Sequence, residues 1–405
     1  MELKPGYKQT EIGVIPDKWR VTPMKDLFAL QNGVNSDKSA YGRGIPFVNV
    51  LEVITHSTLN ETRIPGRISL PDQIRSMFRV QNGDVLFNRT SETQEELGLA
   101  SVYLDKREVV FGGFVIRARP TGDSLHPIFS SYALRSSAIR QQIISRGQGA
   151  VRANIGQQDL SKVRIAVPPF GEQEAIAGAL TDADVLIESL EQLIAKKRLL
   201  KQGAMQELLR PKEAWVDVHF GSVAERIIGG GTPSRSVAGY WNGEIPWMTV
   251  KDFAKFSPFG TVEYITREGL KNSASKLIPR GTLITSTRMG LGKAVVFQVY
   301  VSINQDLKAI FPKKDIDTLY LYYWFQSNEA VIAALGSGST VMGVSLAELK
   351  SVPFSKPPID EQTSIAAILS DMDAEIAALE AKLAKTRLIK QGVMENLLTG
   401  KIRLI

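Results

Sequence analysis

Two stretches of the chain carry apolar residues at the three-then-four spacing of a coiled-coil seam. The seam positions are Ile187, Leu190 and Ile194 in the first stretch and Ile376, Leu379 and Leu383 in the second. A hydroxyl residue followed by a carboxylate three positions later, at Thr181 and again at Ser370, predicts that a long helix begins there. About 28 residues at 1.5 Å each would make each helix a rod of roughly 42 Å. Proline pairs precede both signatures, and we expect a short separate helix between the prolines and each signature.

The residues before each helical stretch show a different pattern. Short apolar runs bounded by glycine, asparagine and proline turns predict strands. These runs are residues 46–50, 84–87, 109–116, 246–250, 282–285 and 294–301. Helices are expected near residues 130–144 and 318–335. The predicted fold class is therefore α/β (α+β), with two mixed α/β domains that each precede a long helix.

The chain is a tandem duplication. Residues 168–209 and 357–398 are identical at 22 of 42 positions when they are aligned at an offset of 189 residues. The regions before them match only loosely. The predicted plan is variable, constant, variable, constant, with bounds at 1–167, 168–213, 214–356 and 357–405. We expect the two constant segments to share one function. We expect the two variable segments to perform different versions of a second function.

The equivalence of the constant segments predicts how their helices pack. Because both carry the same apolar stripe, we expect an antiparallel coiled coil with a pseudo-two-fold axis. The alternative is that each helix packs on its own neighbouring domain. Gly203 and Gly392 occupy the same place in both copies, although glycine costs a helix about 1 kcal/mol relative to alanine. Their retention predicts close packing against another backbone.

The positive charge is concentrated in the variable segments. The chain has 49 basic and 42 acidic residues, a net charge of +7. The variable segments carry +6 and +4, and the constant segments carry −2 and −1. If a polyanion binds, it therefore binds the variable domains. The alternative is an ordinary solvated surface.

Composition narrows the chemistry further. The chain has no cysteine and three histidines, which excludes disulfides and thiolate chemistry and leaves too few ligands for a zinc site. A carboxylate-bound Mg²⁺ site stays open. No apolar run reaches the roughly 18 residues of a spanning helix, and the first residues lack the apolar core of a secretory signal. We expect a cytoplasmic protein.

Three sequence motifs that hint at an enzyme are incomplete. Val167-Pro168-Pro169-Phe170 is similar to the loop of adenine-N6 methyltransferases, but that loop needs Asn, Asp or Ser where Val167 stands. A phosphate loop near residues 290–294 lacks both its first glycine and its Mg²⁺-binding hydroxyl. Asp306-Leu307-Lys308 could mimic the end of a nuclease motif, but no partner Pro-Asp lies at a convincing distance upstream.

The duplicated motifs are similar to those of a known family. They are the Pro-Pro-x-x-Glu-Gln and Lys-Gln-Gly runs of the constant segments, the Ile-Pro-Asp-Lys-Trp run at 15–19, the Tyr-Trp-x-Gly-x-Ile-Pro-Trp run at 240–247, Ile-Thr-Ser-Thr-Arg at 284–288 and the closing Leu-Thr-Gly-Lys at 398–401. Over essentially its whole length the chain resembles the specificity subunit of Type I restriction–modification systems.

The resemblance implies a function and a set of partners. The variable segments would be target recognition domains, and the constant helices would form an antiparallel coiled coil that spaces them and docks methyltransferase subunits, with two such subunits expected. Restriction subunits would join through the complex. The subunit itself would not be a catalyst and would need no cofactor, since S-adenosylmethionine, ATP and Mg²⁺ would belong to its partners. A rod of roughly 42 Å is compatible with two half-sites about one DNA turn apart, so we expect a bipartite, asymmetric DNA target.

Candidate DNA-contacting residues lie in the loops shared by both halves. They are Asn49, Arg89, Thr90, Gln148, Arg152 and Asn154 in the first variable domain, and Lys251, Thr287, Arg288, Gln305, Ser339 and Thr340 in the second. Lys and Arg would bind phosphates, whereas Arg, Asn, Gln, Ser and Thr can read base edges. Each could instead be a turn residue or a surface charge, and Arg288 could equally form an ion pair with a neighbouring carboxylate.

Two other function classes stay open. A coiled-coil interaction scaffold without nucleic acid would show no salt-dependent affinity for DNA. An autonomous DNA-modifying enzyme would turn over DNA as the purified chain, and the incomplete motifs disfavour it.

Overall fold

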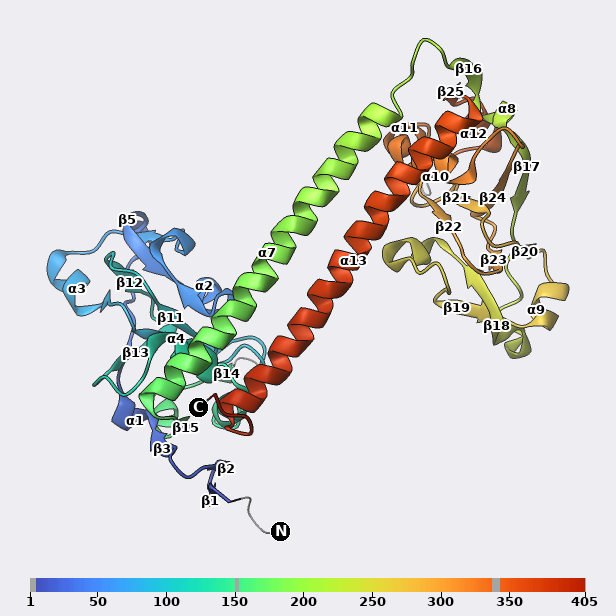
Figure 1. The fold of residues 1–405 in the computed structure, drawn as a ribbon. Helices are drawn as coiled ribbons and strands as arrows, with labels where there is room; N and C mark the ends of the chain where they lie inside the picture. The colour runs from blue at the N-terminus through green and yellow to red at the C-terminus, as the bar shows by residue number, and fades with distance from the viewer. Residues whose placement is uncertain (1–4, 150–152, 337–342, 405) are drawn as a thin grey trace. The chain divides into compact units, whose positions relative to one another are not determined.

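The computed structural model describes residues 5–149, 153–336 and 343–404 of the chain. It divides into two units (Figure 1). The first unit comprises Met1–Leu190 and Lys382–Ile405, and the second comprises Glu191–Ala381. Each unit therefore combines one variable-sequence domain with a part of both long helices.

The long helices are α7 (Phe170–Leu208) and α13 (Ile359–Leu398), of 39 and 40 residues. Each runs without a break through Thr181 or Ser370, so the predicted short helix and second start are wrong, and the rods are longer than roughly 42 Å. The physical reason is visible at the carboxylate of each signature. Asp184 and Asp373 accept hydrogen bonds from tyrosines of the neighbouring domain instead of capping a helix.

The two helices pack antiparallel, and the same clamp holds them in both units. In the second unit, Lys201 Nζ lies 2.6 Å from Asp373 Oδ1, and the Tyr323 hydroxyl donates to Asp373 Oδ2 at 2.9 Å. The first unit repeats this arrangement with Lys390 and Asp184, each displaced by 189 positions from its equivalent, and with Tyr132 from the neighbouring domain. Each lysine also lies over the ring of its tyrosine, at 5.2 and 5.4 Å from the ring centre. The duplication of the clamp explains why the lysines and aspartates are identical in both copies.

The six predicted seam positions differ in burial. Leu190, Ile194, Ile376 and Leu383 are buried, and Ile187 and Leu379 are partly exposed. The glycine prediction is wrong. A Cβ built on Gly203 or Gly392 would meet no atom within 4 Å, so both glycines face open space.

The first turns of each long helix pack on the helix's own domain. Ile176, Ala177 and Leu180 of α7 belong to the core of the first unit. Ile365, Ala366 and Leu369 of α13 are their equivalents in the second. Each long helix thus also packs on its own neighbouring domain through its N-terminal part, which is the alternative stated in the sequence analysis. The two helices pair with each other along the residues that follow.

Two polar residues fix the start of each long helix. Glu172 accepts from Trp19 Nε1 at 2.9 Å, and Arg403 Nε and Nη2 donate to it at 2.8 and 2.7 Å. The Gln173 side chain bonds the backbone of residues 124, 126 and 168. Glu361 and Gln362 make the equivalent contacts in the second unit.

The variable domain of the first unit contains two main sheets and several short helices. Its strands are β1 (Tyr7–Thr10), β2 (Gly13–Pro16), β3 (Arg20–Pro23), β4 (Phe28–Asn32), β5 (Tyr41–Val48), β6 (Thr58–Leu59), β7 (Arg67–Ile68), β8 (Arg79–Val80), β9 (Val85–Asn88), β10 (Thr90–Ser91), β11 (Ala100–Tyr103), β12 (Val109–Phe111), β13 (Val115–Pro120), β14 (Ala153–Asn154) and β15 (Arg164–Val167). Its helices are α1 (Met24–Leu27), α2 (Val50–Thr55), α3 (Asp72–Met77), α4 (Pro127–Ala133), α5 (Ser137–Ile144) and α6 (Gln157–Ser161). The sheet orders are β4-β13-β9-β11-β6 and β7-β5-β12-β8.

The variable domain of the second unit repeats this plan. Its strands are β16 (Val216–His219), β17 (Ala224–Gly229), β18 (Trp241–Met248), β19 (Glu263–Ile265), β20 (Leu277–Ile278), β21 (Leu283–Ser286), β22 (Ala294–Val296), β23 (Val301–Ile303), β24 (Leu307–Pro312) and β25 (Pro353–Lys356). Its helices are α8 (Phe220–Val223), α9 (Arg267–Lys271), α10 (Thr318–Ser327), α11 (Glu329–Ala334) and α12 (Leu346–Lys350). The sheet orders are β17-β24-β21-β22 and β19-β18-β23-β20.

The sequence pattern identified the central strands of both domains but merged neighbours. The run at 109–116 is two strands, β12 and β13, and the run at 294–301 covers β22 and the first residue of β23. The turn that separates β12 from β13 is the loop at 112–114, and the equivalent turn between β23 and β24 is the loop at 304–306. Both loops lie at the candidate site.

Across the residues that the structure describes, no helix combines the length and the apolarity needed to cross a membrane.

Candidate nucleic-acid interface

In both variable domains the same backbone hydrogen bonds join two loops, and we call this arrangement the loop frame. After β9, the Arg89 amide donates to the Phe114 carbonyl at 2.9 Å, and after β21 the Thr287 amide donates to the Asp306 carbonyl at the same distance. The next residue forms an antiparallel bridge in both cases, Thr90 with Asn154 and Arg288 with Gly343. Thr90 and Arg288 therefore occupy one position of the frame, and Phe114 and Asp306 occupy another.

A glycine keeps each frame closed. A Cβ on Gly33 would stand 2.0 Å from the Gly112 carbonyl oxygen, and a Cβ on Gly230 would stand 1.8 Å from the carbonyl oxygen of Ile303. Only glycine fits so close to another backbone. The loop that begins at each glycine is thus held directly against the loop at 112–114 or 304–306.

Four predicted residues of the first domain come together. The Thr90 hydroxyl donates to Asn154 Oδ1 at 2.6 Å, and the backbones of Gln148 and Asn154 exchange two hydrogen bonds of 2.9 and 2.8 Å. The Arg89 carbonyl accepts from the Ile155 amide at 3.0 Å, and the Arg89 guanidinium reaches the Gly113 carbonyl at 3.4 Å. These contacts bring Arg89, Thr90, Gln148 and Asn154 onto one loop surface.

Asn49 lies beside this surface rather than within it. It is exposed at the start of α2, where a capping box joins it to Glu52. A pocket of about 240 Å³ links it to the loop at 112–114, with Asn35, Tyr41 and Phe114 among its lining residues. Arg152 lies outside the described residues.

The predicted residues of the second domain divide into exposed and framework positions. Lys251, Arg288 and Gln305 are exposed. Thr287 is buried, and its hydroxyl donates to the Asp306 carbonyl at 3.0 Å, so the structure places it in the loop frame. Gln305 accepts from the Thr232 hydroxyl at 2.6 Å. Ser339 and Thr340 lie outside the described residues.

Two residues of this surface were not singled out as DNA contacts from the sequence. Phe114 is 62% exposed, which is unusual for a large aromatic side chain at a turn between two buried strands. Asp306 was considered only as part of a nuclease motif. Both occupy the same frame position, and this equivalence is seen only when the strands are paired.

The charges around Asp306 sum to +1. Arg288 Nη1 lies 3.8 Å from Asp306 Oδ1, and Lys308 Nζ donates to the carbonyls of Gln305 and Leu307 at 2.8 and 3.2 Å. Burial lowers the pKa of Lys308; the Asp306 carboxylate opposes this effect and Arg288 adds to it. Within the described part of the chain, no group of three or more His, Cys, Asp or Glu residues could hold a metal ion.

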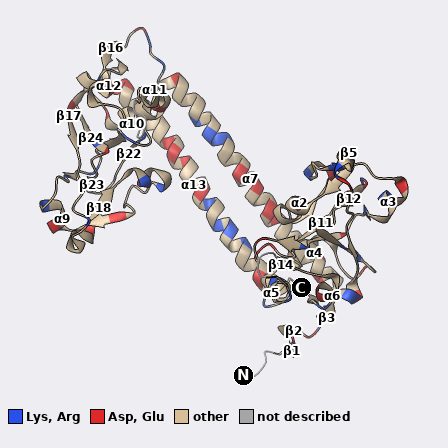
Figure 2. Ribbon diagram, turned by 180° about the vertical axis from the view of Figure 1, so that it is seen from behind, with Lys and Arg blue, Asp and Glu red and all other residues tan. Residues whose placement is uncertain are grey.

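Not all basic residues of the domains are available to a polyanion. The Arg135 guanidinium donates to the carbonyls of residues 53, 54, 56 and 100, and burial lowers its pKa to about 10. Arg140 likewise bonds the carbonyls of residues 95 and 97. Figure 2 shows charges of both signs along α7 and α13 as well as on the domains. Net charge therefore overstates the positive surface of the first domain.

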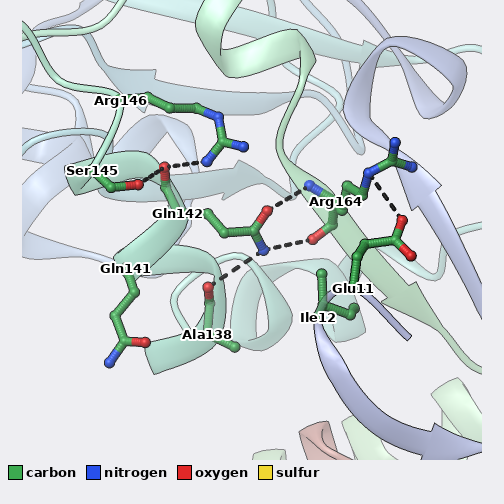
Figure 3. Close-up of a pocket in the computed structure, with 8 residues that line it drawn as sticks. All are labelled: Glu11, Ile12, Ala138, Gln141, Gln142, Ser145, Arg146 and Arg164. Atoms are coloured by element: carbon green, nitrogen blue, oxygen red, sulfur yellow. Dashed lines mark hydrogen bonds and ion pairs between the residues drawn. The ribbon is translucent and has the colours of Figure 1, made fainter. Parts of the chain in front are cut away.

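A shallow pocket lies beside α5 (Figure 3). It has a volume of about 650 Å³, and its two cations are already engaged. Arg164 Nε lies 3.0 Å from Glu11 Oε1, and Arg146 Nη1 donates to the Gln142 carbonyl at 2.8 Å. We assign it no part in the candidate interface.

Comparisons with known proteins match this architecture. The family model described as Type I restriction modification DNA specificity domain matches residues 16–196 and 212–386. The putative type I restriction enzyme MjaX specificity subunit of Methanocaldococcus jannaschii is 26% identical over 419 residues, covering 98% of this chain and 97% of that protein.

Solved structures share the fold. The S subunit of a Type I restriction-modification system from M. genitalium superposes with a TM-score of 0.58 at 16% identity and covers 98% of both chains. A chain from a structure of complex assembly and conformational transition of the type I R-M system gives a TM-score of 0.59 at 18% identity, covering 96% of this chain and 99% of that one.

Proposed function

The chain belongs to the Type I restriction–modification DNA specificity family, and from this premise we propose that it reads a bipartite, asymmetric DNA target with one half contacted by each variable domain. As a specificity subunit it is the non-catalytic part of a Type I enzyme and recognises the DNA target. The observation that carries the bipartite proposal is the pair of equivalent loop frames with unlike side chains. Two copies of one frame support two similar docking modes, and different side chains support two different half-site sequences.

The proposed reading surfaces consist of the candidate residues predicted from the sequence. They are Asn49, Arg89, Thr90, Gln148, Arg152 and Asn154 for one half-site and Lys251, Thr287, Arg288, Gln305, Ser339 and Thr340 for the other. Lys251 and Arg89 are suited to phosphates, and the amide side chains to base edges. Thr287 would act by holding the loop, since its hydroxyl is already engaged. The domain bounds 1–167, 168–213, 214–356 and 357–405 are part of this proposal.

The helix pair would set the distance between the half-sites, with Ile187, Leu190, Ile194, Ile376, Leu379 and Leu383 as its seam. We further propose that it docks two methyltransferase subunits. Leu199 and Leu200 are 69% and 51% exposed next to Gly203, and their equivalents Leu388 and Ile389 are 70% and 53% exposed next to Gly392. Two equal apolar patches support two copies of one partner, and restriction subunits would join through that complex.

The remaining parts of the proposal concern cofactors and location. S-adenosylmethionine, ATP and Mg²⁺ would bind the partner subunits, because the chain is a specificity subunit. The complex would act in the cytoplasm, where its DNA substrate lies.

The test is to co-express the chain with its methyltransferase subunit and to map methylated adenines across the host genome. A motif with two unlike halves and an unread spacer is expected. Replacement of residues 214–356 by the corresponding domain of a relative should change one half only. A motif in which both halves change, or one without a spacer, would contradict the proposal.

A scaffold that binds no nucleic acid is the competing function. The purified complex separates the two, since phosphate contacts make log K fall linearly with log salt concentration. A slope near zero, with the partner subunits present, would favour the scaffold.

The docking patches have their own control. Leu199→Asp and Leu388→Asp should each remove one of two bound methyltransferase subunits, as measured by native mass spectrometry. Asp substitution of Lys196, which is exposed on the same helix, serves as the matched control and should leave both bound. Unchanged stoichiometry in both leucine variants would refute these patches as docking sites.

A further inference from the structure

Arg288 and Asp306 form a polar pair that has no counterpart at the same frame positions of the first unit. The Arg288 side chain is 64% exposed, whereas that of Asp306 is 18% exposed. Asp306 Oδ2 also accepts from Asn304 Nδ2 at 3.0 Å, and the Asp306 amide donates to Asn304 Oδ1 at 3.2 Å. The carboxylate is therefore held by Asn304, and an Arg288 nitrogen lies 3.8 Å from it, within ion-pair distance but beyond hydrogen-bond distance.

The chemistry of this pair fits one base better than the others. A guanidinium offers two parallel donors, and guanine presents two acceptors, O6 and N7, in the major groove. A carboxylate that restrains an arginine reduces the freedom the side chain would lose on binding. Because Arg288 and Lys308 both neighbour Asp306, the cluster stays positive and can approach DNA.

The first unit carries different chemistry on the same frame. Thr90 stands where Arg288 stands, and Phe114 stands where Asp306 stands. A threonine and an exposed phenylalanine cannot make a bidentate bond to guanine, but they can contact the methyl group of thymine. Both units thus share the backbone arrangement of the loop frame, but the side chains at these two positions are charged in the second unit and uncharged in the first.

We infer that Arg288 reads a guanine in the half-site contacted by the second unit, and that Asp306 is the positioning residue for Arg288. This inference rests on the proposed function and deepens it by naming a base and the residue that selects it. The competing interpretation is an ordinary exposed ion pair, in which Arg288 either contacts a phosphate or contacts no DNA.

The experiment uses the full chain assembled with its methyltransferase subunits. A library randomised over the target first gives the wild-type motif, and four duplexes that differ only at the inferred guanine then give the discrimination at that position. Arg288→Ala should lower this discrimination by about 5- to 150-fold and leave the first half-site unchanged. Arg288→Lys should keep the salt slope but lower the affinity for the guanine duplex, and with it the discrimination, because an ammonium lacks the rigid planar fork of a guanidinium.

Asp306→Asn tests the positioning role. It keeps an oxygen for Asn304 but removes the charge that restrains Arg288, so a partial loss of discrimination for guanine is expected with little change in affinity for the other three bases. Arg267→Ala is the matched control, because Arg267 is an exposed arginine paired with Glu244 at 2.6 Å and it lies on α9, which is not part of the loop frame. It should leave the motif intact. Equal thermal unfolding of all variants excludes a folding effect.

A gain of function tests the frame itself. The double substitution Thr90→Arg with Phe114→Asp should introduce a guanine preference into the first half-site. The inference is overturned if the second half-site contains no guanine, or if Arg288→Ala weakens all four duplexes equally and reduces the salt slope by about one, which marks a phosphate contact. Either result leaves the proposed function standing. A wild-type complex without any sequence preference would overturn both.

Discussion

Glu172 and Glu361 are duplicates of one residue, yet their substitution should have unequal effects. Glu172 is 1% exposed and accepts from Trp19 and from two nitrogens of Arg403, which is itself 21% exposed. Glu361 is 30% exposed and pairs with Lys212, which is 54% exposed. The first carboxylate is therefore part of a buried ion pair and the second is part of a surface ion pair.

The magnitudes follow from this burial. Removing one partner of a buried pair costs about 3 to 5 kcal/mol, and we lower this to about 2 to 3 kcal/mol for Glu172→Gln because Arg403 keeps some access to water. An exposed pair contributes about 0.2 to 1 kcal/mol, which sets the expected loss for Glu361→Gln. At tenfold per 1.4 kcal/mol, local opening should increase about 30- to 150-fold in the first variant and up to about 5-fold in the second.

Hydrogen exchange of the full chain measures the local opening directly. In Glu172→Gln, the amides of the first turns of α7 and of the residues around Trp19 should exchange faster, while those of the second unit stay unchanged. Glu361→Gln serves as the matched control in the other unit. Equal effects in the two variants, or no change around Trp19, would refute the assignment of stability to the buried pair.

Three further predictions concern pH, backbone contact and a buried cation. The Arg235 guanidinium lowers the pKa of Glu263 below its usual 4.5. Because the pKa is lower in the folded state, the pair stabilises the fold above about pH 4.5, and this contribution is lost as the pH falls through the folded pKa. In urea titrations between about pH 5 and pH 3, Glu263→Gln should therefore lose less stability than the wild type. Gly33→Ala should disturb the first loop frame and weaken DNA binding by the complex, whereas Gly122→Ala, where a Cβ meets no atom within 4 Å, should leave binding unchanged. Arg135→Ala leaves backbone carbonyls without their donor and should destabilise the first unit by about 3 kcal/mol or more, which limited proteolysis would detect.

The sequence predicted those features of the fold that depend on repetition and periodicity. The spacing of the apolar residues located both long helices, and the internal repeat predicted an antiparallel pair. The error at Thr181 and Ser370 has a clear cause. A hydroxyl followed by a carboxylate can cap a helix, but the same carboxylates, Asp184 and Asp373, instead bind Lys390 and Lys201 from the other helix. The local sequence does not show whether such a carboxylate will cap its own helix or bind a lysine of the other helix.

The candidate site was less predictable than the fold, because it depends on strand pairing. At the repeat offset of 189 residues Phe114 aligns with Ile303 and not with Asp306, and the hydrogen bonds of β9 with β13 and of β21 with β24 are what make Phe114 and Asp306 equivalent. Burial is equally invisible in the sequence. Arg135 and Arg140 contribute to the net positive charge of the first variable segment, yet the guanidinium of each donates to backbone carbonyls of its own domain.

The duplicated segments also separate two reasons for keeping a residue identical. Glu172, Gln173 and Asp184, with their equivalents, each bind the neighbouring domain, the end of the chain or the other helix, so the fold itself explains their identity in both copies. Leu199 and Leu388 are also identical, but they are 69% and 70% exposed, and the glycines four residues later face open space. Leucine is a good helix former, but an exposed leucine buries no apolar surface in the chain alone, and the nearby glycine costs the helix about 1 kcal/mol relative to alanine. We attribute their identity to the proposed docking of methyltransferase subunits, and the repetition of the patch supports two bound copies.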